Sequence, residues 1–470
     1  MKEKKLFDAI TNVPDSLVEE AKNTALLPEQ RSGIFRARFL HSGRKRAVAA
    51  TACAVLVCAL AVLFPLKKST DTAHGLIFEV SLPRAYAFDD YETRRAVRDE
   101  NPIEESFFLA VIDFSYETAS ALLSGESGNQ NFSPLSLYYA LAMAASGADG
   151  ETQSELLTLL GVDHADTLAV QCGNLFRRLY RDNEIGRLTL ANSLWIDDSV
   201  DVVTDYAKLA AENYYASSFH VDFADEDTGR QMAAWIKENA EGSISPEFTT
   251  DSEQILSIIN TVYFCDEWQD RFNKSNTAAD TFYLADGSEI TCDFMNTVYG
   301  SHTFARGDGF TRSKLSLKNG GAMVFILPDE GISPYDLLSS PERLRETFEG
   351  GASVCGKVTW QIPKFSFASS LDCREALERL GVVSAFSGNA DFSGLTGDAA
   401  FISSVRQETH IGIDENGVEA SAFTKIDYAG AALPTDYADM ILNRPFLYGI
   451  TSPNGDLLFI GVCASPNDSR

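Results

Sequence analysis

The stretch NFSPLSLYYALAMAASGADGET, residues 131–152, gives the clearest indication of the fold in this 470-residue chain. Its apolar run predicts a helix over Leu135–Ser146. The segment Gly147–Thr152 then supplies a turn and a helix cap, and a second helix follows over Glu151–Leu160. Upstream, Glu104–Ser124 also has a helical pattern. The first part of the domain is therefore predicted to be helical.

Strand patterns dominate the later part of the chain. They are apolar or alternating runs bounded by Gly, Asp, Asn or Pro, at Ile255–Phe264, Gly321–Leu327, Val358–Phe367, Glu408–Asp414 and Leu457–Val462. Helices followed by antiparallel-looking strands predict an α+β domain. Because no Gly/Ser/Pro-rich break interrupts it, we expect one domain over residues 103–470.

A run of twenty uncharged residues, Ala47–Leu66, is long enough to cross a membrane as a helix. Arg44-Lys45-Arg46 precedes it, so residues 1–46 are predicted to be a basic cytoplasmic tail and the rest to be extracellular. A cleaved signal peptide is the alternative, but the nearest Ala-x-Ala, Ala85-Tyr86-Ala87, lies about twenty residues too late. We therefore expect a single-pass anchor in the cell membrane.

Residues 67–102 mix Lys, Asp, Thr, Pro and Arg without an apolar period. As a flexible coil they would form an extracellular stalk spanning about 30–35 Å. The chain carries a net charge of −28, and its acidic part repels phosphate backbones. Nucleic acid is therefore not expected as a partner.

The sequence lacks familiar catalytic and metal-binding motifs. It has no His-Glu-x-x-His, no Gly-x-Ser-x-Gly, no phosphate-binding loop and no Cys-x-x-Cys. The acidic runs Asp222–Asp227 and Asp436–Asp439 lack calcium-loop spacing and fit a solvated surface. We therefore predict no cofactor, no metal and no enzyme activity.

Several segments in one order resemble the serpin family over residues 103–466. They include Asn131–Ser136, Ala191–Trp195, Ile259–Phe264, Pro363-Lys364-Phe365 and Arg444-Pro445-Phe446. The resemblance implies helices around a large central β-sheet and an exposed reactive-centre loop. It also implies a monomeric suicide inhibitor: a serine or cysteine protease cleaves the loop, which then inserts into the sheet and traps the acyl-enzyme.

The resemblance places the hinge of that loop at Glu415, Gly417, Val418, Glu419, Ala420, Ser421, Ala422 and Thr424. A loop that becomes a central strand must alternate inward and outward side chains. The inward set would be Val418, Ala420, Ala422, Thr424, Ile426 and Tyr428, and none of these is charged. Every charged residue of this segment belongs to the alternate, outward set. This alternation favours insertion independently of the family resemblance.

Two features depart from the family pattern. The first inward position is usually threonine but is Val418 here, and Phe423 is bulky. Under the sheet opening, the resemblance implies a polar cluster of Ser133, Ser136 and Gln407, with Trp268, where a histidine is common at the position of Gln407. Since an amide can donate and accept, we expect the cluster to be rewired rather than lost.

The usual loop length of the family implies a reactive bond between Ala431 and Ala432, within Gly430–Leu433. Counting back from Arg444 gives Pro434 instead, but inserted-strand length favours the forward count. Small side chains there suit an elastase-like or subtilisin-like protease, whereas a trypsin-like one is disfavoured.

A non-inhibitory serpin is the alternative, in which the domain is the extracellular binding or sensor part of a membrane protein. The cytoplasmic tail could then carry a signal. The membrane anchor and the sequence around Asn443–Phe446 resemble those of bacterial serpins.

Overall fold

The structure is a computed structural model that describes residues 75–78, 80–125, 127–244, 246–248, 250–252, 254–418 and 436–468. The predicted cytoplasmic tail, transmembrane helix and reactive bond lie outside these residues. The chain divides into two units, Met1–Thr70 and Asp71–Arg470, and all the described residues belong to the second.

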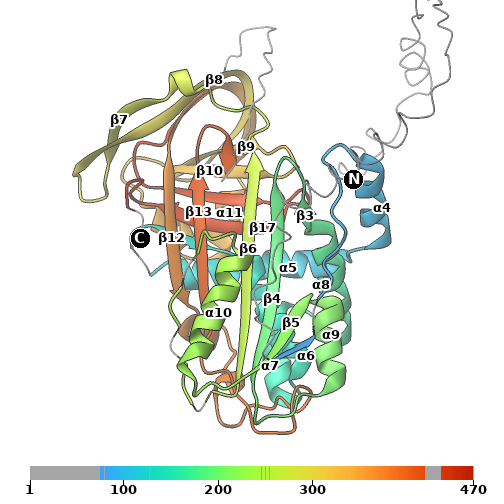
Figure 1. The fold of residues 1–470 in the computed structure, drawn as a ribbon. Coiled ribbons are helices and arrows are strands. Elements are labelled where there is room, and N and C mark those ends of the chain that lie inside the picture. Colours follow the sequence, from blue (N-terminus) through green and yellow to red (C-terminus); the bar gives the residue numbers. More distant parts are fainter. Residues whose placement is uncertain are drawn as a thin grey trace, which may run out of the picture. The chain divides into compact units, whose positions relative to one another are not determined.

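The central sheet has eight strands and runs the length of the domain (Figure 1). Their order is β1-β5-β4-β6-β14-β13-β12, and β3 pairs with β4 beside it. The strands are β1 (Leu76–Phe78), β3 (Arg181–Asp182), β4 (Arg187–Asp197), β5 (Ala216–Val221), β6 (Leu256–Glu267), β12 (Phe365–Asp372), β13 (Arg406–Ile413) and β14 (Gly417–Val418).

A second sheet of nine strands has the order β15-β11-β8-β9-β10-β16-β17-β2, with β7 paired to β8. Its strands are β2 (Gln130–Phe132), β7 (Ala278–Tyr283), β8 (Glu289–Gly307), β9 (Phe310–Ser316), β10 (Ala322–Pro328), β11 (Ala352–Pro363), β15 (Tyr437–Ile441), β16 (Phe446–Thr451) and β17 (Leu457–Cys463). Every residue of β10 and β17 is buried, which explains their continuous apolar sequences.

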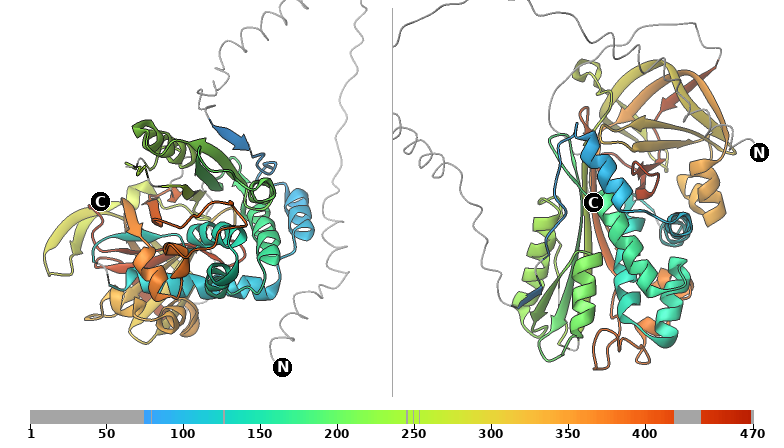
Figure 2. Two further views of the ribbon diagram at one scale, coloured as in Figure 1. Left: turned by 90° about the horizontal axis from the view of Figure 1, so that it is seen from below. Right: turned by 90° about the vertical axis from the view of Figure 1, so that its right-hand side faces the viewer.

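Helices cover both faces of the central sheet (Figure 2). The helices of the described residues are α4 (Tyr91–Glu100), α5 (Glu105–Leu123), α6 (Pro134–Gly147), α7 (Gly150–Leu160), α8 (Ala165–Leu179), α9 (Thr204–Asn213), α10 (Glu226–Asn239), α11 (Pro341–Glu349), which packs on the second sheet, and α12 (Arg374–Arg379). On one face, α10 packs through Met232 and Ile236 against Ile259 of β6. The α+β prediction and the three predicted helices are confirmed.

The first predicted helix pair is built as its sequence indicates. Ser133 precedes α6 and its hydroxyl accepts from the Ser136 N–H at 3.3 Å, while Pro134 occupies the first turn. Asp149 caps α7 through the Gly150 N–H at 2.8 Å. At its other end α7 stops at Gly161, whose φ of 67° is the left-handed conformation that glycine adopts readily. Most of α6 is buried, because it lies under the central sheet.

The predicted strand Val358–Phe367 is wrong as a single strand. The chain leaves β11 of the second sheet at Pro363 and enters β12 of the central sheet at Phe365. Lys364 between them is the corner, and its side chain pairs with Glu415. Apolar residues on both sides of the corner hide the change of sheet from the sequence pattern.

Residues 76–100 correct the prediction of an irregular stalk. Strand β1 pairs antiparallel with β5 at the edge of the central sheet, and α4 follows. Arg181 of β3 lies over the Tyr86 ring at 5.2 Å, and the Arg177 Nε donates to Asn101 Oδ1 at 2.5 Å. These contacts hold the segment without a buried apolar face, which is why the sequence shows no period there.

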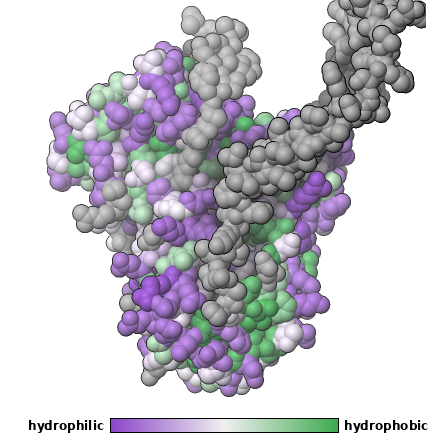
Figure 3. Space-filling model, viewed as in Figure 1, coloured by the Kyte–Doolittle hydropathy of each residue, from purple (hydrophilic) through white to green (hydrophobic). Residues whose placement is uncertain are grey.

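Among the described residues, α5 is the one helix long and apolar enough to cross a membrane. However, 56% of its most apolar window is buried inside the domain. Its Phe114 packs edge-on against Tyr138 of α6 at 5.0 Å. A core helix explains this composition, so α5 is weak support for a membrane span. The face drawn in Figure 3 is mostly hydrophilic, in keeping with the acidic composition.

Candidate functional site

A slot between β6 and β13 divides the central sheet. On its other edge β6 pairs with β4, from Arg187↔Cys265 to Ile196↔Leu256. Toward β13, the described part of β6 pairs only through Gly417↔Glu267 and Val418↔Asp266. Strand β13 meets β14 only at Ile413↔Val418. Both pairings are antiparallel, so β6 and β13 run parallel to each other and could accept a strand between them that is antiparallel to both.

Two residues of β14 occupy the upper end of the slot. Val418 is 1% exposed and belongs to the main hydrophobic core, as an inward side chain should. At Gly417, a Cβ would lie 2.1 Å from the Asp266 carbonyl oxygen, so only glycine fits. Gly417 and Val418 of the predicted hinge therefore lie inside the sheet.

Glu415, just before β14, is fixed by charge and hydrogen bonds. Its carboxylate lies 3.2 Å from Lys364 Nζ and accepts from Thr277 Oγ1 at 2.8 Å. Burial opposes the charge, but the bonds from the Glu415 backbone, Thr277 and Lys364, with the Lys364 charge, outweigh it and hold the pKa of Glu415 below its usual value. This anchors the start of the hinge to the corner between β11 and β12.

Trp268 supports the same turn from below. Its Nε1 donates to the Asp414 carbonyl at 2.8 Å, and its backbone N–H donates to the Asn416 carbonyl at 3.0 Å. The indole is 1% exposed. Trp268 thus directly follows the hinge end of β6. The hydrogen bonds described for it go to Asp414 and Asn416, not to Ser133, Ser136 or Gln407, with which it was grouped from the sequence.

The polar cluster of Ser133, Ser136 and Gln407 lies where α6 begins beneath the slot. The Gln407 Oε1 accepts from the Ser133 N–H at 2.7 Å, and its Nε2 donates to the Ser133 carbonyl at 2.9 Å. The amide thus donates and accepts, as the sequence predicts. These bonds join β13 to the N-terminal end of α6.

Two further residues, missed in the sequence, extend the polar cluster across the sheet. Asn260 of β6 accepts from Ser136 Oγ and donates to Asn192 of β4, and Asn192 donates to the Tyr214 carbonyl at 2.5 Å. The signal was present, because each asparagine interrupts an apolar run at a core-facing position of a strand.

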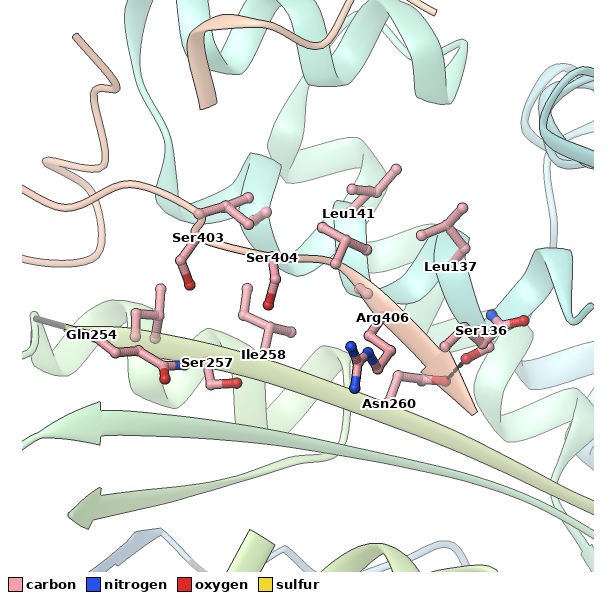
Figure 4. A pocket seen from close by; sticks show the side chains of 16 residues that line it. Ser136, Leu137, Leu141, Gln254, Ser257, Ile258, Asn260, Ser403, Ser404 and Arg406 are labelled. Atoms are coloured by element: carbon pink, nitrogen blue, oxygen red, sulfur yellow. Dashed lines mark hydrogen bonds between the residues drawn. The ribbon is translucent and has the colours of Figure 1, made fainter. Parts of the chain in front are cut away.

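Below the polar cluster the slot opens into a pocket (Figure 4). Its walls are the lower part of β6 and the segment that leads into β13, and its floor is α6. The lining includes Leu137 and Leu141 of α6, Ile258 and Asn260 of β6, and Ser403 and Arg406 opposite them.

Comparison with known proteins agrees with this architecture. The family described as Serpin (serine protease inhibitor) matches residues 109–466, which is more than half of the chain. The chain belongs to the serpin family. Serpins are protease inhibitors and not enzymes, so the expectation that the chain is not an enzyme is confirmed.

Individual serpins are similar over most of their length. Serpin-Z2A of Triticum aestivum is 30% identical over 379 residues, covering 75% of this chain and 94% of the relative. The leukocyte elastase inhibitor of Bos taurus is 32% identical over 363 residues, covering 72% and 94%. The crystal structure of the thermophilic serpin tengpin in its native state has a TM-score of 0.71 at 28% identity, covering 83% of this chain and 97% of that one.

Part of the predicted serpin site lies outside the described residues. These are the hinge residues Glu419, Ala420, Ser421, Ala422 and Thr424 and the bond region Gly430, Ala431, Ala432 and Leu433. The serpin chain is described again from Asp436, and β15 then pairs parallel with β11 of the second sheet. The loop therefore connects the slot to the second sheet.

Proposed function

We propose that this serpin is a suicide inhibitor of serine proteases that traps its target by inserting the cleaved loop into the slot. The observation that carries the proposal is the pairing of Gly417 and Val418 between two parallel strands, β6 and β13, which lack a common partner below them among the described residues. Insertion would continue a strand that has already begun.

Extending the register of β14 gives the positions that the inserted residues would take in this proposal. Continuing the antiparallel pairing from Val418↔Asp266 sets Ala420 opposite Phe264, Ala422 opposite Val262, Thr424 opposite Asn260, Ile426 opposite Ile258 and Tyr428 opposite Leu256. Val262 and Leu256 belong to the main core, and Ile258 and Phe264 pack against it. The uncharged set would therefore face inward, and the charged set would face the α10 side.

The lower part of this register coincides with the pocket. Its lining residues Asn260, Ile258 and Leu256 are the ones that would face Thr424, Ile426 and Tyr428. The Thr424 hydroxyl would meet the polar cluster, and the two larger side chains would fill apolar space. Burying each of those contributes about 1.5–3 kcal/mol, which favours the inserted form.

The trapping step follows from ordinary acyl transfer. The protease serine Oγ attacks the carbonyl carbon of Ala431, the Ala431–Ala432 peptide bond breaks, and Ala432 leaves as a new amino terminus carrying the transferred proton. The protease is then esterified to Ala431. Insertion that is faster than hydrolysis of this ester would trap it. The small residues at the bond, together with a relative named for elastase inhibition, support an elastase-like or subtilisin-like target.

The non-inhibitory alternative rests on Val418, Phe423 and Gln407. Two of these three fit the inhibitor equally well, since Val418 is buried in β14 and Gln407 satisfies both backbone groups of Ser133. A sensor or binding role would require cleavage of the loop without trapping, which the experiment below distinguishes.

For location, we propose a bacterial cell-membrane protein with Ala47–Leu66 as the single span, a cytoplasmic N-terminus and a monomeric extracellular serpin domain. Protease treatment of intact cells should remove the domain and leave a tail epitope protected. Degradation of both would contradict this topology.

To test inhibition, the full chain in detergent micelles is incubated with pancreatic elastase and with subtilisin and analysed on denaturing gels. We expect a covalent band at the summed mass and a released peptide that begins at Ala432 or Leu433. Cleavage with no covalent band, and with no gain in thermal stability of the cleaved protein, would show a loop that does not insert.

A further inference from the structure

An acidic pair, Asp266 and Glu267, ends the strand that borders the hinge. These are the only charged residues of β6, and they are 1% and 2% exposed. Asp266 is paired directly with Val418. Side chains directly opposite in an antiparallel pair lie on the same face, with Cβ atoms about 5 Å apart. The Val418 and Asp266 side chains are therefore neighbours on the core-facing side of the sheet when the hinge is docked, and both are buried.

The Asp266 carboxylate also connects the sheet to the turn between β9 and β10. It accepts from the Asn319 N–H at 3.1 Å, from Asn319 Nδ2 at 3.1 Å and from the Glu267 N–H at 2.8 Å. Glu267 makes a second link to the same turn, because its carbonyl accepts from the Lys318 N–H at 2.9 Å. The hinge therefore docks against a strand end that is fixed on its other side.

Basic residues are near, but they are engaged elsewhere. Glu267 forms ion pairs with Arg271 and Lys318. Arg187 pairs with Asp182 and Glu241. Arg181 donates to the carbonyls of Arg178 and Tyr180, and its charge also attracts Asp266 without forming an ion pair with it. The other titratable groups around the site are Cys265 on β6 and, from the hinge, Asp414 and Glu415. Within the described residues, Asp266 itself forms no ion pair.

The balance of these effects favours the neutral acid. Burial raises the pKa of Asp266 to about 7, although the N–H groups of Glu267 and Asn319 favour the charged form, and the charge of Glu267 adds to the rise. A buried carboxylate without an ion pair is costly, so anything that returns water to it favours ionisation. Withdrawal of Val418 would do so.

We propose that docking of the hinge at Val418 and protonation of Asp266 are coupled, so that the hinge is docked in acid and released in alkaline solution. The sign follows from linkage. The docked state holds the proton more tightly, so raising the pH through about 7 favours the released state. Each unit by which docking raises the pKa changes the docking equilibrium tenfold. Docking is independent of protease trapping; any effect on trapping rests on the proposed function.

The test measures amide hydrogen exchange in the full chain in detergent, for the peptide that contains Val418, after correction for intrinsic exchange at each pH. From pH 5.5 to 8.5 we expect protection to fall at least tenfold in the wild type and to stay constant in Asp266→Asn. Glu408→Gln is the matched control, because Glu408 on β13 is a second acid whose pKa is raised by burial, although it is only half-buried. It should keep the wild-type fall.

A second experiment blocks docking and measures the effect on pH dependence. It uses Val418→Glu, in which a charge beside Asp266 prevents docking. The wild-type midpoint of thermal unfolding should fall as the pH rises through 7, and this variant should lose that fall. The coupling is wrong if wild-type protection does not change with pH, if Asp266→Asn shows the same change, or if Val418→Glu keeps the wild-type fall. Neither hydrogen exchange nor thermal unfolding involves a protease. A failure of the protein to inhibit proteases would therefore not affect this test of the coupling.

Discussion

Gln407 and Ser133 are bonded to each other twice, with the Gln407 amide bridging the N–H and the carbonyl of Ser133 at 2.7 and 2.9 Å. All these groups are buried. The bond pair fixes the first part of β13 to the beginning of α6, directly beneath the slot. It is therefore both a support for the fold and a contact that an inserting strand must pass.

Replacing Gln407 by alanine should destabilise the protein. The substitution leaves the buried Ser133 N–H without a partner, whereas the Ser133 carbonyl keeps the Leu137 N–H at 3.3 Å, so the expected cost is about 1–3 kcal/mol in the free energy of unfolding. Urea unfolding followed by circular dichroism measures this difference. Gln407→Glu is the control: the protonated acid can accept from the Ser133 N–H and donate to its carbonyl, so it should recover part of the loss at acidic pH, whereas the ionised form should not. Equal stability of the alanine variant would show that water replaces the amide.

Insertion should discriminate between the two faces of the loop. Ala422→Arg would bury a charge opposite Val262, which costs several kcal/mol, whereas Ser421→Arg would place the same charge on the outer face. We expect the first variant to be cleaved by elastase without forming a covalent band, and the second to trap elastase nearly as well as the wild type. The ratio of trapped to cleaved serpin on denaturing gels measures this. Equal ratios would contradict the register.

The residue before the reactive bond should set the target. Ala431→Arg fills the acidic primary pocket of trypsin, so this variant should trap trypsin and lose about a hundredfold or more in its rate with elastase. Ala432→Arg, on the other side of the bond, should do neither. Rates of complex formation and the N-terminus of the released peptide provide the readout. If Ala431→Arg is cut by trypsin but not at residue 431, the bond lies elsewhere.

The parts of the fold that the sequence predicts well are those where one physical effect dominates. Apolar period and cap residues predict α6 and α7, and continuous burial predicts β10 and β17. The predicted strand over Ile255–Phe264 is too short, because β6 continues through Asp266 and Glu267. Charges normally end an apolar strand, but here Arg271 and Lys318 neutralise Glu267 from outside the strand.

In the candidate site, too, local sequence patterns predict some features and miss those that depend on distant parts of the chain. Alternation of charge predicts that Val418 faces inward, and it is buried. Asn260 and Asn192 were missed because their partners come from α6 and from the segment before β5, which no local pattern can bring together. The pairing of Asp266 with Val418 also depends on register across strands that are far apart in the sequence.

The ion pair between Lys364 and Glu415 should stabilise the hinge in a pH-dependent way. Because the pKa of Glu415 is lowered in the folded protein, the pair contributes above the unfolded value of about 4.3 and is lost as the pH falls through the folded value. Because the Lys364 side chain is 36% exposed and solvent screens its charge, Lys364→Met should cost about 1 kcal/mol at pH 7 and progressively less below pH 4.

Urea unfolding of the wild type and Lys364→Met between pH 3 and 7 measures this convergence. Lys208→Met is the control, since Lys208 pairs with Glu212 on the exposed surface of α9. It should change the stability by no more than about 0.5 kcal/mol at any pH. A constant difference for Lys364→Met across the range would show that packing of its side chain matters, and not its charge.

Residues 75–101 should contribute to the stability of the domain, although their sequence resembles a flexible stalk. A chain that begins at Ile103 loses β1, so the edge of β5 is open and the His220 N–H loses its 2.6 Å bond to the Gly75 carbonyl. It also loses the ring of Tyr86 over which Arg181 lies and the partner of Arg177. Against a chain that begins at Asp71, we expect a loss of about 3 kcal/mol and a thermal midpoint lower by several degrees, because these contacts are each worth about 1 kcal/mol. Differential scanning calorimetry of both chains gives the comparison, and equal midpoints would return the segment to the role of a stalk.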